Sequence, residues 1–327
     1  MCPDKPRSEV VVSTRPPRIA ILWQGLSGYF QAQLRALAAG AEVLLSYRSS
    51  GVEAPFDDDA LTDSTSGYAW TGEPNEGELN ELLDRFEPDA VLVSSWHIGP
   101  YRRAARRRRG STLRILCMDN QWAGTAKQWA GVASARWVIQ PAYDAVLVAG
   151  DRQADFAERL GFSAEDIIWG LYTCDYPLYA AVAERRGPSV PPSTFLYVGR
   201  LVRSKRVDVM LQGYRRDRAR ESAPWPLRVA GTGPLAEDLR EVAGVEMLGF
   251  VQPGELPAVL ADAGCLLLPS RFEPWGVVVH EATAAGLPII CTRAASSHRP
   301  GENERGRSFR SDLQVRAKEL HPWHIPG

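Results

Sequence analysis

The sequence predicts an α/β protein of two domains, each with a parallel sheet. Its 327 residues correspond to two domains at about 150 residues each. Short apolar runs alternate with amphipathic segments, as in sheets covered by helices. The alternation is interrupted at residues 187–193, GPSVPPS, where three prolines favour a linker. Hydrophobic residues make up 45% of the chain and charged ones 24%, which excludes disorder throughout.

The first domain is predicted at residues 18–187, after a polar leader, residues 1–17, that we expect to be disordered. The segment from Ser49 to Asn75 is rich in Gly, Asp, Ser and Thr and predicts a loop. Five apolar runs predict the strands, which are Arg18–Trp23, Glu42–Ser46, Asp89–Ser94, Leu113–Cys117 and Ala145–Val148.

The second domain is predicted at residues 188–293 and shows the clearer alternation. Its predicted strands are Thr194–Val198, Leu227–Ala230, Val245–Leu248, Cys265–Leu268 and Pro288–Cys291. Helices are expected to begin near Val207, Pro234, Gly254 and Gly276. Residues 294–327 are polar and rich in Arg, and we expect them to be poorly ordered. Because parallel sheets bind ligands at the carboxyl ends of their strands, a cleft between the domains is the expected site.

Charge and cysteine usage exclude several classes of protein. Lys and Arg number 38 against 39 Asp and Glu, so no overall attraction to nucleic acid follows. No apolar run approaches the roughly 20 residues that span a bilayer, and the leader lacks the apolar core of a signal peptide, so we expect a cytoplasmic protein. The five scattered cysteines predict neither disulfides nor a thiolate zinc site, and no metal site is predicted.

Two glutamates carry the most informative pattern. Glu273 and Glu281 lie in LPSRFEPWGVVVHEATAAGLPII, residues 268–290, where a strand is followed by a loop and a helix. Eight helical residues rise about 12 Å, so the carboxylates can bracket an extended ligand. The amides of Gly276, Val277 and Val278 at the helix start suit a phosphate. Carboxylates accept hydrogen bonds from paired hydroxyls, so the order sugar, diphosphate and ribose predicts a nucleotide sugar.

Two further segments agree with a nucleotide sugar. In VGRLVRSKR, residues 198–206, Arg200 follows a strand and Lys205 precedes a helix, so both cations could reach one diphosphate. In AGTGPL, residues 230–235, Gly231 and Gly233 allow the backbone to approach a ligand. GTGPLA also fits a dinucleotide fingerprint, but no acidic residue ends the next strand, which disfavours a dehydrogenase.

From about Thr194 to Thr292 the chain resembles the retaining GT-B glycosyltransferases of family 4, also called group 1. The motifs that carry the resemblance are VGRL with its following Lys, GxGPL, LGFV, LPSRFEPWGVVVHEA and AAGLPII. It implies two Rossmann-like domains facing a cleft, and a hexose moved from a UDP- or GDP-sugar donor to a glycan, lipid or small molecule. No cofactor is implied. It also implies that Glu273 contacts the transferred sugar, Glu281 the ribose, and Arg200 and Lys205 the leaving diphosphate.

The first half resembles the family less closely. WQGLSG, residues 23–28, resembles the Gly-rich first loop, which implies a donor contact for Gly25. Many relatives carry a His after the fourth strand, where this chain has Asp119 and Asn120. His97, after the preceding strand, is the nearest substitute and is taken as a candidate catalytic residue.

Two alternatives stay open from the sequence. The basic helix at residues 101–109 is either a solvated face or a contact with anionic lipid, through Arg102, Arg103, Arg106, Arg107, Arg108 and Arg109. The family's C-terminal crossover helix is expected to be missing after Thr292. The chain is therefore either an active transferase with an abbreviated end or a truncated, inactive nucleotide-sugar-binding protein.

Overall fold

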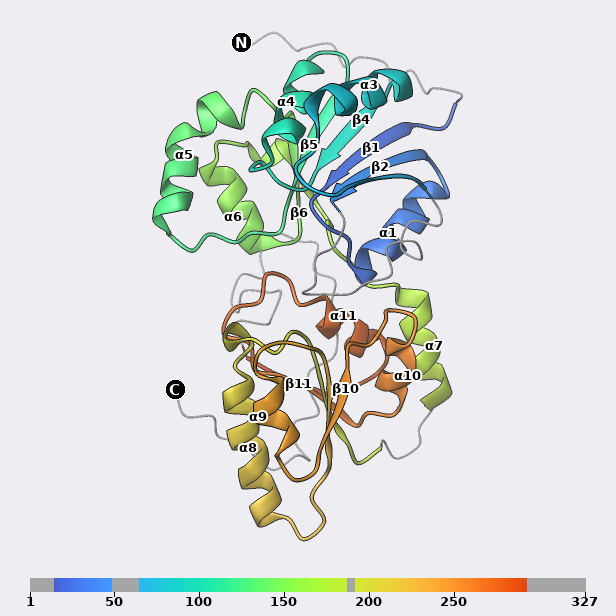
Figure 1. The fold of residues 1–327 in the computed structure, drawn as a ribbon, viewed down its shortest axis with the longest axis vertical. Coiled ribbons are helices and arrows are strands. Elements are labelled where there is room, and N and C mark those ends of the chain that lie inside the picture. Colours follow the sequence, from blue (N-terminus) through green and yellow to red (C-terminus); the bar gives the residue numbers. More distant parts are fainter. Residues whose placement is uncertain (1–14, 49–64, 187–191, 293–327) are drawn as a thin grey trace, which may run out of the picture.

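The computed structural model describes residues 15–48, 65–186 and 192–292, which form two α/β domains (Figure 1). The first sheet has seven parallel strands in the order β3-β2-β1-β4-β5-β6-β7. The strands are β1 (Arg18–Trp23), β2 (Glu42–Arg48), β3 (Ser66–Trp70), β4 (Ala90–Val93), β5 (Leu113–Met118), β6 (Ala145–Val148) and β7 (Ile167–Trp169).

Helices cover both faces of this sheet. One face packs against α3 (Glu76–Phe86), α4 (Gly99–Arg107), α5 (Ala126–Val138) and α6 (Asp151–Arg159). The other face packs against α1 (Gly28–Ala38), whose Phe30 and Leu34 are buried. A short 3-10 helix, Ala164–Asp166, precedes β7. Burial on both faces explains why the strands are nearly continuous apolar runs.

The second sheet has five parallel strands in the order β10-β9-β8-β11-β12. They are β8 (Phe195–Val198), β9 (Leu227–Ala230), β10 (Val245–Gly249), β11 (Cys265–Leu268) and β12 (Ile289–Cys291). A 3-10 turn, Arg203–Lys205, leads into α8 (Val207–Arg220), and α9 (Ala236–Arg240) packs on the same core. The other core of this domain includes α10 (Leu256–Ala261) and α11 (Val277–Ala284).

Helix α7 (Tyr176–Arg186) departs from the expected domain boundary. It precedes the linker, but Tyr179 and Val182 are buried in the core formed by α10 and α11. Arg186 also donates to the carbonyls of Leu260 and Ala261, at 2.8 and 3.3 Å. We expected the first domain to run to residue 187. Because α7 packs on the second domain, the first domain ends before α7.

The expectation of a loop between Ser49 and Asn75 is wrong in its last part. β3 pairs with β2 there, and Trp70 is buried with its indole N–H donating to Ser46 Oγ at 2.8 Å. Only one of its five residues is buried, so it lacks the apolar run that marks the other strands. β7 was missed because it has three residues. The leader up to residue 14, the linker residues 187–191, and the tail with its expected loss of the crossover helix lie outside the described residues.

None of the helices in the described ranges is both long enough and apolar enough to cross a bilayer.

Candidate functional site

Lys205 and Glu273 come together at the carboxyl ends of two neighbouring strands. β8 and β11 pair in parallel, so the turn after β8 and the loop after β11 lie side by side. The Arg271 amide donates to the Ser204 carbonyl at 2.9 Å and joins the two segments. Lys205 Nζ then lies 2.5 Å from Glu273 Oε2, and both side chains are mostly buried.

Ser270 also holds Glu273. The hydroxyl of Ser270, a fully buried residue, donates to Glu273 Oε2 at 3.0 Å. The backbone carbonyl of Ser270 accepts a hydrogen bond from the Thr292 hydroxyl at 2.5 Å. A mostly buried carboxylate with a cation and a hydroxyl on one oxygen keeps a fixed orientation.

Gly276 begins α11 in the manner that the sequence predicts. It adopts φ 74° and ψ 51°, a left-handed conformation that favours Gly, and no side chain in the described part of the chain caps the helix. The amides of Val277 and Val278 lie in the first turn, at the positive end of the helix dipole. No described side chain accepts a hydrogen bond from them as a helix cap. Glu273 stands three residues before this helix start, so a carboxylate and a donor-rich helix terminus are adjacent.

Glu281 lies on α11 and is only 8% exposed. Its Oε1 accepts a hydrogen bond from the Tyr179 hydroxyl of α7 at 3.1 Å. Burial raises the pKa of this carboxyl to about 7. Glu281 is thus enclosed between two helices in this structure, and its contact with a ribose stays a prediction.

Gly231 and Gly233 are required by the packing of the chain against itself. A Cβ at Gly231 would lie 1.9 Å from the Gly199 carbonyl oxygen, and one at Gly233 would lie 2.5 Å from that of Leu201. Leu201 also donates its amide to the Thr232 carbonyl at 2.8 Å. The glycines therefore let the loop after β9 lie against the loop that carries Arg200, and any role toward a ligand stays a prediction.

Gly231→Ala is expected to lower the free energy of unfolding by about 3 kcal/mol, because the methyl group meets a backbone carbonyl that cannot move aside. Gly254→Ala is the matched control, since a Cβ at the exposed Gly254 would have no atom of the described residues within 4 Å. Urea unfolding measures the stability of both variants. Equal stability of the two would contradict the close packing of Gly231 against the Gly199 carbonyl.

Arg200 is exposed in the loop after β8, and its carbonyl accepts the Tyr197 hydroxyl at 2.9 Å. The sequence predicted that Arg200 and Lys205 converge on one diphosphate. In the structure the ammonium of Lys205 is paired with Glu273. An ammonium has three hydrogens, so two remain for a ligand once one serves Glu273.

His97 is exposed just after β4 in the first domain. Its Nε2 accepts the indole N–H of Trp96 at 2.7 Å, and its amide donates to Ser95 Oγ at 3.3 Å. Partial burial, with Lys127 and Arg102 nearby, lowers its pKa. Within the described ranges no hydrogen bond or ion pair joins His97 to a second-domain residue, so its catalytic role stays a prediction. A Cβ added at Gly25, between β1 and α1, would meet none of the described residues within 4 Å.

The basic helix α4 is less free than the sequence suggests. Arg108 is buried, where it contacts Asp84 and Asn80, which corrects its assignment to a solvent-facing lipid contact. Arg103 pairs with Glu76 at 2.6 Å, and Arg107 lies 3.8 Å from Asp84. Arg102 donates to the Trp96 carbonyl.

Sequence reasoning missed four residues that shape this region: Ser270, Tyr179, Gln153 and Trp275. Ser270 and Trp275 stand inside the motif around Glu273, so their position offered a signal. Gln153 lies in no motif, whereas Tyr179 ends IIWGLYTCDYPLY, residues 167–179, which resembles with departures the family segment that closes the first domain. Gln153 of α6 donates to the carbonyl of Pro274 at 2.8 Å, and Trp275 donates to that of Tyr172 at 3.1 Å. The loop after β11 is therefore bound to segments far away in sequence.

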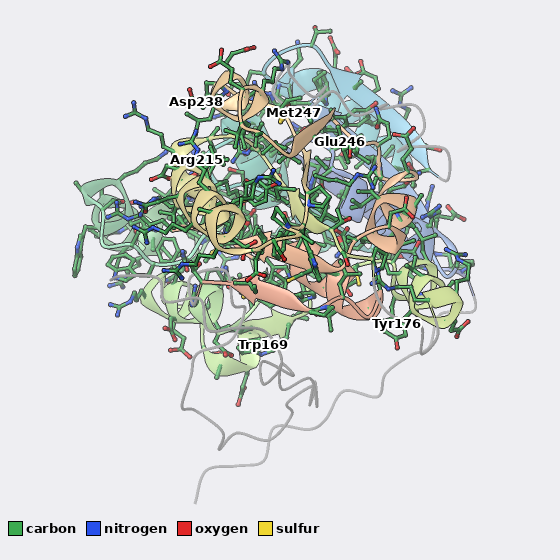
Figure 2. All side chains as sticks on the ribbon, turned by 90° about the horizontal axis from the view of Figure 1, so that it is seen from below. Trp169, Tyr176, Arg215, Asp238, Glu246 and Met247 are labelled. Atoms are coloured by element: carbon green, nitrogen blue, oxygen red, sulfur yellow. The ribbon has the colours of Figure 1, made fainter. Side chains whose placement is uncertain are left out.

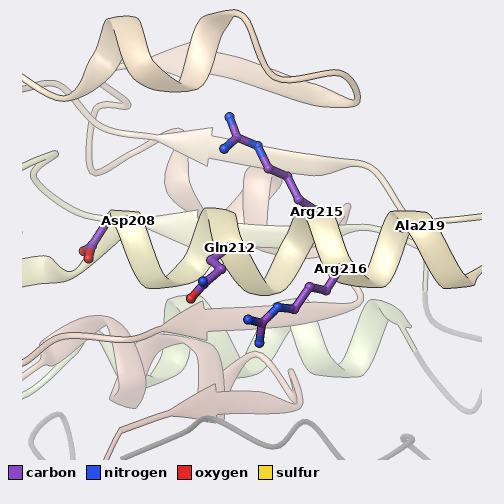
Figure 3. A pocket seen from close by; sticks show the side chains of 5 residues that line it. All are labelled: Asp208, Gln212, Arg215, Arg216 and Ala219. Carbon is purple, nitrogen blue, oxygen red and sulfur yellow. The ribbon is translucent and has the colours of Figure 1, made fainter.

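A hollow on the outer side of α8 lies apart from these residues. It is lined by Asp208, Gln212, Arg215, Arg216 and Ala219, all from one helix (Figure 3). It includes none of the predicted site residues. Among the described residues no group of three or more His, Cys, Asp or Glu side chains could hold a metal ion.

Comparison with solved structures identifies the architecture. The Anabaena protein HepE in complex with UDP and glucose superposes with a TM-score of 0.62 over 86% of this chain and 81% of its own, at 14% identity. Sucrose-phosphate synthase from Thermosynechococcus elongatus gives 0.59 over 84% and 81%, at 16% identity. The fold is GT-B. These GT-B neighbours confirm the predicted pair of α/β domains with parallel sheets.

The family model matches the second half of the chain. Residues 192–314 match the family model described as Glycosyl transferases group 1. Glycogen synthase of Mycobacterium tuberculosis is 28% identical over 185 residues, which are 51% of this chain and 43% of that protein. An uncharacterised glycosyltransferase of Methanocaldococcus jannaschii is 34% identical over 102 residues, 29% of this chain and 26% of that one. The chain thus spans less than half the length of these relatives.

Proposed function

We propose that the protein is a retaining glycosyltransferase that moves a hexose from a nucleotide-diphosphate sugar to a hydroxyl of an acceptor. The observation that carries the proposal is the pairing of Lys205 with Glu273 beside the open start of α11. The similarity of residues 192–314 to group 1 glycosyltransferases supports it, as does the complex of a GT-B neighbour with UDP and glucose.

The proposed mechanism is electrostatic. As the bond between sugar and diphosphate breaks, negative charge grows on the phosphate oxygens. The amides of Val277 and Val278, the guanidinium of Arg200 and the ammonium of Lys205 stabilise that charge. The acceptor oxygen bonds to the anomeric carbon on the face from which the diphosphate leaves, and the acceptor's hydroxyl proton passes to the departing phosphate oxygen. Donors that are already fixed in place need no reorganisation when the charge develops.

The two glutamates have separate tasks in this proposal. Glu273, oriented by Lys205 and Ser270, accepts hydrogen bonds from the hydroxyls of the transferred sugar. Glu281 accepts hydrogen bonds from the ribose. Its carboxylate must then either give up the hydrogen bond from the Tyr179 hydroxyl or accept from that hydroxyl and the ribose together. Gly25 and His97 are proposed to face the donor and acceptor from the first domain.

The alternative, a protein that binds a nucleotide sugar without catalysis, is not favoured. The ion pair of Lys205 with Glu273 and the start of α11, which the mechanism needs, are both present. Calorimetric titration with UDP- and GDP-sugars, followed by an assay of nucleoside diphosphate release, tests the two functions. We expect binding and turnover with at least one donor. Binding of a donor without turnover on a range of acceptors would contradict the proposal.

We also propose that the protein works in the cytoplasm and that the α4–α5 side of the first domain contacts anionic membrane. Helix α5 has no acidic residue, and its Trp129 and Trp137 are 58% and 67% exposed. Arg106 and Arg109 are exposed on or beside α4. Tryptophan favours the membrane interface, and each basic residue near an anionic surface contributes about 1 kcal/mol.

The double variant Trp129→Ala/Trp137→Ala is expected to bind vesicles of phosphatidylcholine with 30% phosphatidylglycerol at least about fivefold more weakly than the natural chain. Trp169→Ala is the control, because Trp169 is similarly exposed, at 54%, but lies on β7 at the periphery in Figure 2. Co-sedimentation measures binding. Equal sedimentation of the natural chain with and without the anionic lipid would overturn the membrane contact.

A further inference from the structure

Gln153 connects the two domains through its side-chain amide. It lies in the first turn of α6 and is 1% exposed. Its Nε2 donates to the Asp119 carbonyl of the first domain at 2.9 Å and to the Pro274 carbonyl of the second domain at 2.8 Å. An amide NH₂ has two hydrogens, so each has one carbonyl acceptor. Because both partners accept, only the nitrogen can face them, and the orientation of the amide is determined.

The residue held by Gln153 stands inside the candidate site. Pro274 follows Glu273 directly and lies two residues before Gly276, which begins α11. We call residues 270–276 the donor loop. A hydrogen bond to the Pro274 carbonyl fixes the middle of this loop, between the carboxylate proposed for the sugar and the amides proposed for the diphosphate.

Trp275 provides a second connection from the next residue of the donor loop. Its indole N–H donates to the Tyr172 carbonyl at 3.1 Å. The indole ring lies against the backbone of Gly150, where a Cβ would come within 2.3 Å of the ring. Gly150 caps the same helix α6 that carries Gln153. Two successive donor-loop residues are thus anchored to the first domain.

We infer that Gln153 is a positioning residue that holds the donor loop from the opposite domain, so that the donor site is complete only while the domains are in contact. Gln153 touches no reacting atom in this account and acts through Pro274 and Glu273. The inference rests on the proposed function for the identity of the ligand. The anchoring itself rests on the hydrogen bonds and burial of Gln153 and Trp275.

Gln153→Ala tests the inference, with Gln140→Ala as the matched control. Gln140 Nε2 also donates to a backbone carbonyl, that of Leu160 at 2.9 Å, but within the first domain. We expect kcat/KM for the donor to fall at least about tenfold in Gln153→Ala and to stay within about twofold in Gln140→Ala. Trp275→Phe keeps an aromatic ring against Gly150 but loses the indole donor, so we expect a smaller loss of about threefold.

Hydrogen exchange gives a readout that does not depend on activity. Amides of residues 270–281 are expected to exchange at least about threefold faster in Gln153→Ala than in Gln140→Ala or the natural chain. The same region should exchange faster in Gly150→Ala, where the methyl group displaces the indole. Circular dichroism checks that each variant is folded, and Trp275→Phe remains informative if Gln153→Ala does not fold.

The outcomes separate this inference from the proposed function. Exchange and kcat/KM in Gln153→Ala equal to those of Gln140→Ala would overturn the positioning role. A natural chain that transfers no sugar from any nucleotide donor would overturn the proposed function, while faster exchange in Gln153→Ala would still support the anchoring of the loop.

Discussion

Lys205→Ala is expected to lower the rate of sugar transfer about 100- to 1000-fold, the usual loss when one donor to a developing oxyanion is removed. The structure gives two reasons for so large an effect. The Lys205 ammonium lies beyond the carboxyl end of β8 and pairs with Glu273, which precedes α11. The negative charge of the departing diphosphate is proposed to grow there. The ammonium also orients Glu273 from 2.5 Å, so its loss disturbs the sugar contact as well.

Removal of Lys205 alone leaves the Glu273 carboxylate mostly buried without a cation, which also lowers stability. The double variant Lys205→Ala/Glu273→Gln removes both charges and is expected to recover the melting temperature without recovering transfer. Arg203→Ala is the control for the same turn, since Arg203 is exposed. Transfer by Lys205→Ala within tenfold of the natural rate would contradict the electrostatic mechanism.

Glu281→Gln is expected to make stability less dependent on pH. Burial raises the folded-state pKa of Glu281 to about 7 from an ordinary 4.5, so the folded chain holds this proton more tightly than the unfolded chain does. The stabilisation is therefore fully present below pH 4.5 and is lost as the pH rises to 7. Such a shift corresponds to about 3 kcal/mol.

Urea unfolding at pH 5 and pH 8 measures this linkage. The natural chain should lose stability relative to Glu281→Gln between the two values, by up to about 3 kcal/mol. Donor affinity should run in the opposite sense, because only the ionised carboxylate accepts fully from ribose hydroxyls, so it should rise with pH in the natural chain alone. Parallel pH profiles for the two proteins would show that Glu281 does not titrate in this range.

The apolar runs predicted the central strands because parallel sheets are buried on both faces. β1, β6 and β9 agree with the runs at both ends. β3 was hidden because four of its five residues are exposed, and a surface strand has no apolar run. The sequence does not show to which domain α7 belongs, because the apolar residues Tyr179 and Val182 could pack against either sheet. In the structure they pack against α10 and α11.

Arg200 and Lys205 were also predicted as site residues, but the sequence predicted the relative positions of candidate residues only where they are close along the chain. Glu273, Gly276 and Glu281 share one loop and helix, so their spacing was informative. The ion pair of Lys205 with Glu273 spans 68 positions and the hydrogen bond of Gln153 with Pro274 spans 121. Such contacts depend on which strands are neighbours and on how the domains meet. For Gly231 the sequence predicted a close approach of the backbone to a ligand, and the close approach present in the structure is to the Gly199 carbonyl.

Release of nucleoside diphosphate from a UDP- or GDP-sugar tests the central claim most directly. The natural chain, incubated with each donor and a panel of acceptor alcohols, is expected to release diphosphate faster with an acceptor than without, and to form a product that keeps the donor's anomeric configuration. Lys205→Ala in the same assay should release almost none. Release that is equal in the two proteins, or absent with every donor, would contradict the account.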